Sequence, residues 1–231
     1  MHYRRIMNVS GKFIVVDGPD GAGKGTQIVN LARWIESEGG NCVRTRDPGG
    51  TTVGDRIRHI LLDYDLSDMD ATCETLLFMA SRAQLVAEVV RPALAAGRTV
   101  ICDRFISATC AYQVAAGLPR EKVLELGRLA VGQTWPDLTL VLDLPPEVGF
   151  ERIGRKPGQT GRRGGGGQVS LFEGTSPDAM ERRPMEFHRR VRALFRELPQ
   201  VYPAPVVLVD AAGSEEAVFA EIQEAIRRAF V

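Results

Sequence analysis

Short apolar runs alternate along the chain with longer segments in which apolar residues recur every three or four positions. Runs such as "KFIVVD" and "LTLVLDL" are nearly continuous in Val, Ile and Leu, which is typical of strands buried on both faces. The predicted strands cover residues 12–17, 41–46, 98–103, 138–144 and 205–210. The helical period predicts helices over residues 24–38, 53–62, 74–96, 107–116, 121–131 and 214–230. We expect Pro92 to bend or break the third of these helices.

Strands that alternate with helices predict βαβ units. The fold class is therefore α/β, with a five-stranded parallel sheet covered by helices on both faces. In such sheets, ligands bind where the strands end. Asp17, Arg46, Asp103 and Asp143 each stand at the end of a predicted strand. We therefore expect a binding site at this edge of the sheet.

Two segments follow neither pattern. Residues 1–10 have a basic start but no apolar stretch after it, so they do not form a signal peptide, and we expect a disordered lead-in. Residues 154–178, "GRKPGQTGRRGGGGQVSLFEGTSPD", are rich in Gly, Arg and Ser and too long for an ordinary connection. They form either a functional lid or a disordered insert. No segment approaches the length that spans a bilayer.

Composition narrows the class further. The 231 residues suit one domain, and 44% hydrophobic with 25% charged residues is typical of a soluble globular protein. Lys+Arg and Asp+Glu both number 29, so no overall field favours nucleic acid or a membrane as partner. The four cysteines show no C-x-x-C pair and no His partner at ligand spacing, which does not fit a metal site. Cys42 and Cys102 lie in apolar runs, and we expect them to be buried free thiols, as in a cytoplasmic protein.

The stretch "DGPDGAGKGTQ" nearly matches the phosphate-binding pattern G-x-x-x-x-G-K-[ST]. It follows a predicted strand and opens a helix, where backbone N–H groups and the helix dipole attract phosphate. A chance Gly-rich turn is the alternative, but this context argues against it. We expect the ATP phosphates to contact Gly18, Gly21, Ala22, Gly23, Lys24, Gly25 and Thr26.

One position of this loop departs from the pattern. Gly25 stands where a Ser or Thr hydroxyl would contact Mg²⁺, and Thr26 follows one place late. "GKGTQ" is similar to the loop of adenylate kinases, which also have Gly there. In that arrangement water and phosphates hold most of the metal, as suits an ion that dehydrates reluctantly. Asp103 could hold Mg²⁺ through water, or it could simply cap its strand.

Over nearly its whole length the chain resembles the bacterial type of thymidylate kinase. The resemblance rests on "FIVVDGPDGAGKGTQ", "TRDPGGTTVGDRIRHILL", "ETLLFMASRAQLVAEVVRPALAAG", "VICDRFISATCAYQ" and "PDLTLVLDLPPEVGFERI", in the family's order and spacing. It implies a three-layer α/β/α P-loop kinase fold and the reaction ATP + dTMP → ADP + dTDP, in dTTP biosynthesis. It also implies Mg²⁺ and a homodimer. The adenine is expected near residues 210–213.

The resemblance assigns an acceptor site for dTMP. Matching arginines contact its phosphate, a role that the guanidinium forks of Arg58 and Arg104 suit, although Arg58 alone would pass for a solvated helix arginine. The matching Phe stacks on thymine, the matching Arg bonds a base carbonyl, and a Thr and a Gln read the pyrimidine edge. Tyr112 would lie near the sugar, Asp20 near its 3′-hydroxyl, and Arg46 would line the cleft with Asp47. The expected dTMP site comprises Asp20, Asp47, Pro48, Arg58, Phe78, Arg82, Arg104, Thr109, Tyr112 and Gln113.

The lid departs most from the family. Phosphoryl transfer needs positive charge on the migrating group and exclusion of water. The family's D-R-x-E pattern corresponds to "DAME" here, with Ala179 in place of the arginine, and a sibling subgroup has an arginine in the phosphate loop where this chain has Gly21. Arg155, Arg162 and Arg163 are therefore equal candidates for the catalytic arginine, beside Lys24, Arg104 and Asp103. Alternatively residues 161–168 are a solvated insert, and only Lys24, Mg²⁺ and Arg152 supply charge.

Two other functions stay open. "GKGTQ" favours a kinase for AMP, CMP or UMP, whereas the combination of Phe78, Arg82, Thr109 and Gln113 argues for dTMP. Gly25, Ala179 and the unusual lid would also fit a nucleotide-binding protein without catalytic activity.

Overall fold

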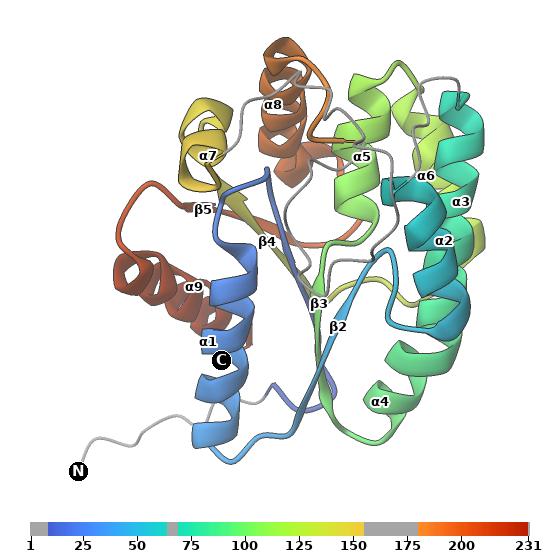
Figure 1. The fold of residues 1–231 in the computed structure, drawn as a ribbon. Coiled ribbons are helices and arrows are strands. Elements are labelled where there is room, and N and C mark those ends of the chain that lie inside the picture. Colours follow the sequence, from blue (N-terminus) through green and yellow to red (C-terminus); the bar gives the residue numbers. More distant parts are fainter. Residues whose placement is uncertain (1–8, 64–68, 155–179, 231) are drawn as a thin grey trace, which may run out of the picture.

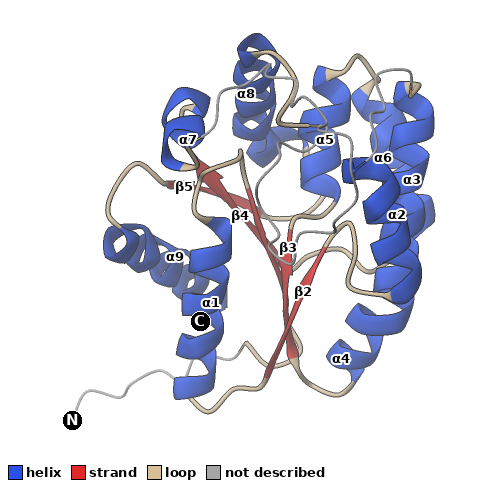
Figure 2. Cartoon of the chain, in the orientation of Figure 1, coloured by secondary structure: helices blue, strands red, loops and turns tan. Residues whose placement is uncertain are grey.

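The computed structural model describes residues 9–63, 69–154 and 180–230. Within them, five strands form one parallel sheet in the order β2-β3-β1-β4-β5 (Figure 2). The strands are β1 (Phe13–Asp17), β2 (Cys42–Arg46), β3 (Thr99–Asp103), β4 (Leu138–Asp143) and β5 (Val206–Asp210). The predicted α/β class with a five-stranded parallel sheet is confirmed.

Helices cover both faces of the sheet. The helix α1 (Lys24–Ser37) packs beside α9 (Glu215–Phe230) on one face (Figure 1). The other face carries a larger group in which α5 packs on α8, α3 and α6. The remaining helices are α2 (Thr52–Asp63), α3 (Ala71–Leu85), α4 (Arg91–Ala95), α5 (Ile106–Ala115), α6 (Arg120–Val131), α7 (Pro146–Arg152) and α8 (Met185–Val201). The helices α7 and α8 were not predicted.

Alternation of side chains along β1 joins the two layers. Phe13 and Val15 point into the core beneath α3, α5 and α8, while Ile14 and Val16 point into the core beneath α1 and α9. All four are fully buried, as the continuous apolar runs predict for central strands.

The edge strands do not meet that expectation. Along β2 no residue is fully buried, and Cys42 is only partly covered, so the prediction that Cys42 is buried is wrong. An edge strand has a neighbour on one side only, and its run of apolar residues is shorter. Cys102 in β3 is buried as predicted.

The predicted helix over residues 74–96 divides before Pro92. A π-helical turn, η1 (Val86–Val90), separates α3 from α4, and Pro92 lies in the first turn of α4. Proline lacks an N–H, so it fits the first turn of a helix better than an interior position.

Of the two segments without periodicity, only a few end residues belong to the part of the chain that the structure describes. Val9 and Ser10, expected in a disordered lead-in, are in place: Val9 is buried and accepts a hydrogen bond from the Thr99 hydroxyl, and Ser10 donates to the Gly97 carbonyl. Of the predicted lid, only Gly154 belongs to the described residues. No helix in the described part of the chain has both the length and the apolar content to cross a membrane.

Candidate active site

The four residues at the strand ends lie at one edge of the sheet, as predicted, but their side chains contact different partners. Asp17 and Asp103 face the region between the sheet and α5. Asp143 is instead held by two arginines of α8: Arg192 donates from Nε at 2.7 Å, and Arg196 donates from Nη1 at 2.7 Å. Arg46 pairs with Asp55 at 3.4 Å in a neighbouring groove, so the expectation that it lines the acceptor cleft is wrong.

The turn between β1 and α1 depends on glycine for space as well as for backbone conformation. Gly18 has a φ of 133°, and a Cβ there would lie 2.4 Å from the carbonyl oxygen of Leu142. Gly21 has a φ of 75°, and its Cβ would lie 2.1 Å from the carbonyl oxygen of Gly149 in α7. Leu142 of β4 and Gly149 of α7 pack directly against the turn, so no side chain fits at Gly18 or Gly21. The backbone of the turn is therefore what faces outward at the start of α1. Such exposed N–H groups form an anion site.

Lys24 lies across this turn. Its ammonium donates to the carbonyl oxygens of Gly18 and Pro19, at 3.1 and 2.9 Å. Burial lowers the pKa of Lys24, and the nearby Arg104 lowers it further, against the opposing carboxylates of Asp20, Asp103 and Asp17. A bound phosphate would bring further negative charge to this lysine, beside the carboxylate of Asp20 at 4.0 Å.

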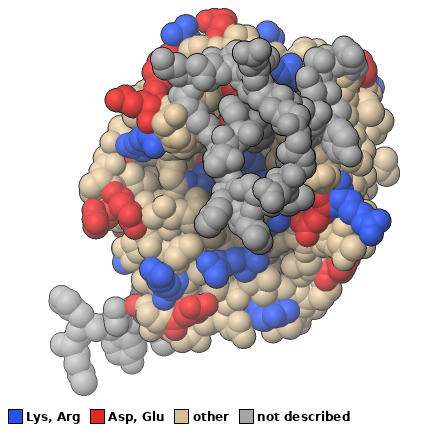
Figure 3. All heavy atoms as spheres, viewed as in Figure 1, with Lys and Arg blue, Asp and Glu red and all other residues tan. Residues whose placement is uncertain are grey.

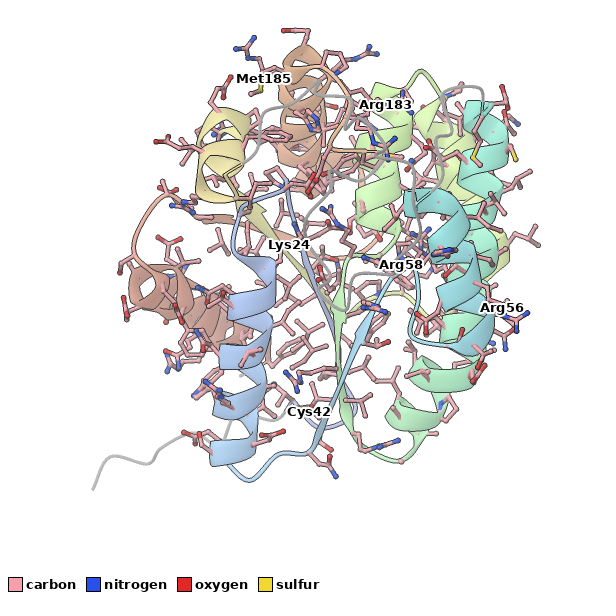
Figure 4. All side chains as sticks on the ribbon, viewed as in Figure 1. Lys24, Cys42, Arg56, Arg58, Arg183 and Met185 are labelled. Carbon is pink, nitrogen blue, oxygen red and sulfur yellow. The ribbon has the colours of Figure 1, made fainter. Side chains whose placement is uncertain are left out.

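A cavity of about 230 Å³ opens beside the turn. Lys and Arg side chains are visible near the centre of this face (Figure 3). In Figure 4, Lys24 and Arg58 come from α1 and α2 on either side of the strand ends, whereas Arg56 points away from α2 on its outer side. The cavity is lined by all ten residues expected to bind dTMP, together with Lys24, Asp103, Leu62, Ala108 and Met180.

Asp20 connects the turn to the far wall of this cavity. It accepts hydrogen bonds from Arg104 and, at 3.1 Å, from the Tyr112 hydroxyl. Burial opposes its charge, but Arg104 and Lys24 hold the pKa of Asp20 below its usual range. Burial raises the pKa of Tyr112 well above normal, so its hydroxyl stays a donor. Arg104 has a φ of 65°, unusual for a side chain of this size, and this conformation directs it at the turn.

Arg82 organises the wall formed by α3 and α5. Its side chain is almost completely buried and pairs with the equally buried Asp47. Its Nη2 donates to the Phe105 carbonyl at 3.0 Å and to the Thr109 hydroxyl at 3.1 Å. Burial raises the pKa of Asp47, against the attraction of Arg82. The Nη1 of Arg82 donates to the sulfur of Met79 at 3.1 Å. Four of the five guanidinium N–H groups are therefore used within the protein, and one N–H on Nη1 remains for a ligand.

Asp103 is the residue best suited to hold a cation. Its Oδ1 is buried and has no hydrogen-bond partner among the described residues, and its side chain lines the cavity. No cluster of three or more His, Cys, Asp or Glu side chains that could hold a metal occurs in the described ranges. One unsatisfied carboxylate without further protein ligands fits an ion that keeps most of its water.

A second, smaller cavity of about 160 Å³ adjoins the outer side of the turn. Ala22, Gly23 and Thr26 line it, as do Ala211 and Gly213 after β5. Arg152 closes one side by donating to the carbonyl oxygens of Ala211 and Ala212, at 2.9 and 3.1 Å. This is the region where the resemblance expects the adenine.

Three residues that line the cavity were not predicted from the sequence. Leu62 and Ala108 belong to ordinary amphipathic patterns, and Met180 follows the aperiodic segment, so no pattern distinguishes them. Conversely, the catalytic candidates Arg155, Arg162 and Arg163, and Ala179 in "DAME", lie outside the described residues.

Comparison with known proteins identifies the relatives of this arrangement. The family model described as Thymidylate kinase matches residues 16–222. The chain belongs to the thymidylate kinase family. A thymidylate kinase from Desulfosudis oleivorans is 41% identical over 217 residues, which are 94% of this chain and 96% of that protein. One from Pelobacter propionicus is 42% identical, again over 94% of this chain, and covers 92% of its own length.

The match to the thymidylate kinase family includes both cavities. It begins within β1 and runs through the phosphate loop, α3 and α5, and past the residues after β5 to α9. Like the chain's other relatives, a thymidylate kinase from Exiguobacterium matches almost end to end, with 41% identity over 93% of each chain. The resemblance inferred from separate motifs is therefore confirmed for the chain as a whole.

Proposed function

We propose that this protein transfers the γ-phosphoryl group of ATP to dTMP, giving ADP and dTDP. One observation carries the proposal: a single cavity is lined both by Lys24 of the phosphate loop and by the Phe78, Arg82 and Gln113 wall. A phosphate site and a pocket with an aromatic ring and polar side chains that share one space suit a reaction between two nucleotides. Membership of the thymidylate kinase family agrees with this reaction.

The donor would lie along the turn from Gly18 to Thr26. Its phosphates would accept hydrogen bonds from the N–H groups at the start of α1 and from Lys24, which would leave the carbonyl oxygens it now contacts. Adenine would occupy the cavity beside Arg152 and Gly213.

The acceptor would place its phosphate between Arg58 and Arg104. Arg58 donates from Nη1 to the Pro48 carbonyl at 3.0 Å, and its side chain lines the cavity. Asp20 and Tyr112 would lie at the sugar, and Phe78 against the base. A phosphate oxygen of the acceptor then attacks the γ-phosphorus while the bond to the β-phosphate oxygen breaks.

Catalysis would consist of positioning and charge neutralisation, without a covalent intermediate. Lys24 and Arg104 both donate to the Gly18 carbonyl at 3.1 Å, so their positive charges lie side by side where the two phosphates would meet. We include Arg155, Arg162 and Arg163 as candidates for the charge on the migrating group. Mg²⁺, when bound with ATP, neutralises developing charge on the phosphates, and Asp103 would hold it through water.

We also propose a cytoplasmic homodimer. Exposed large apolar side chains lie on three helices of one side of the molecule: Val53 and Ile60 on α2, Leu76 on α3 and Leu129 on α6. Leu129 has 84% of its surface exposed, which favours a partner surface. Sedimentation of the wild type and of Leu129→Glu tests this, because the variant should shift toward monomer.

A turnover screen tests the reaction itself. With ATP and Mg²⁺, dTMP should be phosphorylated faster than AMP, CMP, UMP or dCMP. Faster use of AMP or CMP would replace dTMP with that acceptor. Binding of ATP and dTMP without formation of dTDP would instead make the protein a nucleotide-binding protein without catalytic activity.

A further inference from the structure

The side chains of Phe78 and Arg82 on α3 and of Thr109 and Gln113 on α5 form the base-facing wall of the cavity. Behind this wall lies a buried carboxylate to which the reaction assigns no role. Glu74 stands in the first turn of α3, and only 7% of its side-chain surface is exposed. It does not line the cavity. Burying a carboxylate is unfavourable unless its oxygens find partners, so the partners of Glu74 indicate what it does.

Glu74 belongs to a regular arrangement between α3 and α5. Glu74, Phe78 and Arg82 follow one another at intervals of four residues, so they share one face of α3. Thr109 and Gln113 share a face of α5 in the same way. Two hydrogen bonds join these faces: Arg82 donates to the Thr109 hydroxyl at 3.1 Å, and Gln113 Nε2 donates to Glu74 Oε2 at 3.1 Å. Phe78 lies between them on α3.

The contact with Glu74 determines which way the Gln113 amide faces. A side-chain amide can accept through its oxygen or donate through its nitrogen, and the two orientations fit the same space. The guanidinium of Arg183, 3.7 Å from the other carboxylate oxygen, marks Glu74 as the negative partner. A carboxylate only accepts hydrogen bonds, so the nitrogen of Gln113 turns toward Glu74 and its carbonyl oxygen is left for a ligand.

This orientation matters for base recognition. Thymine presents a carbonyl oxygen beside an N3–H donor, whereas cytosine presents an amino donor beside an N3 acceptor. The one remaining N–H of Arg82 Nη1 and the acceptor oxygen of Gln113 complement the first pattern and oppose the second. A reversed amide would place a donor toward N3 and so favour cytosine.

We propose that Glu74 is a positioning residue that fixes the Gln113 amide and thereby makes the acceptor cavity select a thymine-type imide over cytosine. The proposal rests on the proposed function, because it assigns the cavity to a pyrimidine monophosphate. Glu74 acts through Gln113 and does not touch the substrate.

Titration calorimetry with dTMP and dCMP, without ATP, tests the proposal on the full chain. Glu74→Gln keeps the shape but can donate as well as accept, so Gln113 is free to reverse. The ratio of the dCMP to the dTMP dissociation constant should fall about tenfold, which is the size of one hydrogen bond exchanged for a mismatch. The affinity for ATP should not change. If Glu74→Gln is too unstable to measure, Glu74→Asp replaces it. An aspartate is too short to reach Gln113, so the ratio of the dCMP to the dTMP dissociation constant should fall by the same factor.

Two control variants and one double-mutant comparison distinguish positioning from a structural role. Glu88→Gln alters a similar amide–carboxylate pair, with Gln84 Nε2 donating at 2.8 Å on the exposed side of the helix, and should leave the ratio unchanged. Arg183→Met removes the cation that Glu74 also contacts, and should keep most of the selectivity. In a Gln113→Ala background, Glu74→Gln should have no further effect on the ratio.

Each other result decides against the proposal. An unchanged ratio in Glu74→Gln, an equal loss in Arg183→Met, or an additional loss in the Gln113→Ala background would overturn the role of Glu74 while leaving the kinase intact. Failure of the wild type to bind dTMP would overturn the proposed function, and the inference with it.

Discussion

The phosphate loop and the base-facing wall border the same cavity but are built in opposite ways. The loop is one continuous stretch between β1 and α1, and it presents backbone held in shape by glycine. The wall is made of side chains from α3 and α5, cross-linked through Arg82 and Glu74. Substitutions in the loop should therefore lower the rate of phosphoryl transfer most. Substitutions in the wall should mainly lower the free energy of unfolding and the selectivity for the base.

Lys24→Ala should have the largest effect on turnover. Lys24 is the only positively charged side chain of the loop between residues 17 and 27, so we expect kcat to fall by about 10³-fold, as when one preorganised donor at a developing charge is removed. Thermal stability should not fall, because burial lowers the pKa of Lys24 and the folded state gains little from its charge. Steady-state kinetics and a melting curve measure both.

Lys12→Ala provides the control. Lys12 pairs with Asp137 at 3.2 Å near the surface, away from the cavity, and its loss should leave kcat unchanged. If Lys24→Ala kept wild-type turnover, the assignment of the loop to the donor would be wrong.

Arg82→Met should show the opposite behaviour. It leaves the buried carboxylate of Asp47 without its cation, so the free energy of unfolding should fall by about 3–5 kcal/mol. Chemical denaturation measures this. Asp47→Asn combined with Arg82→Met should recover part of the loss, because no uncompensated charge then remains.

Arg91→Met is the matched control for Arg82→Met. Arg91 lies at the start of α4 and donates to the neutral Thr134 hydroxyl at 2.9 Å and the Val131 carbonyl at 2.9 Å. Its loss should lower stability by only about 1 kcal/mol. Equal losses in the two variants would mean that Arg82 and Asp47 do not act as a buried pair.

The same contrast explains what could be predicted from the sequence. The loop and the central strands are contiguous, and their residue types follow from local geometry, so they were predicted directly. The wall residues were assigned only by resemblance, since a Phe or Arg on a helix gives no sign of its partners. Glu74 looked like any acid in the first turn of a helix. Asp143 and Arg46 stood at strand ends like Asp17, and only tertiary packing pairs them elsewhere.

Gly149→Ala should damage the loop from outside it. The added Cβ would lie 2.1 Å from the carbonyl oxygen of Asp20, so either α7 or the loop must move. We expect unfolding free energy to fall by about 1–3 kcal/mol, as for overpacking, with a weaker affinity for ATP. A Cβ at Gly21 would in turn lie 2.1 Å from the carbonyl oxygen of Gly149, so there is no room for an arginine there, which agrees with a catalytic arginine supplied from elsewhere. Unchanged stability and ATP affinity would show that the loop tolerates movement of α7.

Gly25→Ser should have the smallest effect. It tests whether a side chain at this position of the loop can contact Mg²⁺. A Cβ at Gly25 meets nothing within 4 Å, so the missing hydroxyl is not a matter of space. A serine there would restore the side chain that contacts Mg²⁺ in the usual loop, and the Mg²⁺ concentration for half-maximal turnover should fall about two- to fivefold, the worth of one modest ligand contact. Gly25→Ala carries the same Cβ without the hydroxyl and should leave that concentration unchanged, while helix stability rises by roughly 0.5–1 kcal/mol. If serine and alanine behave alike, the metal lies out of reach of this position and depends on the Asp103 side of the cavity alone.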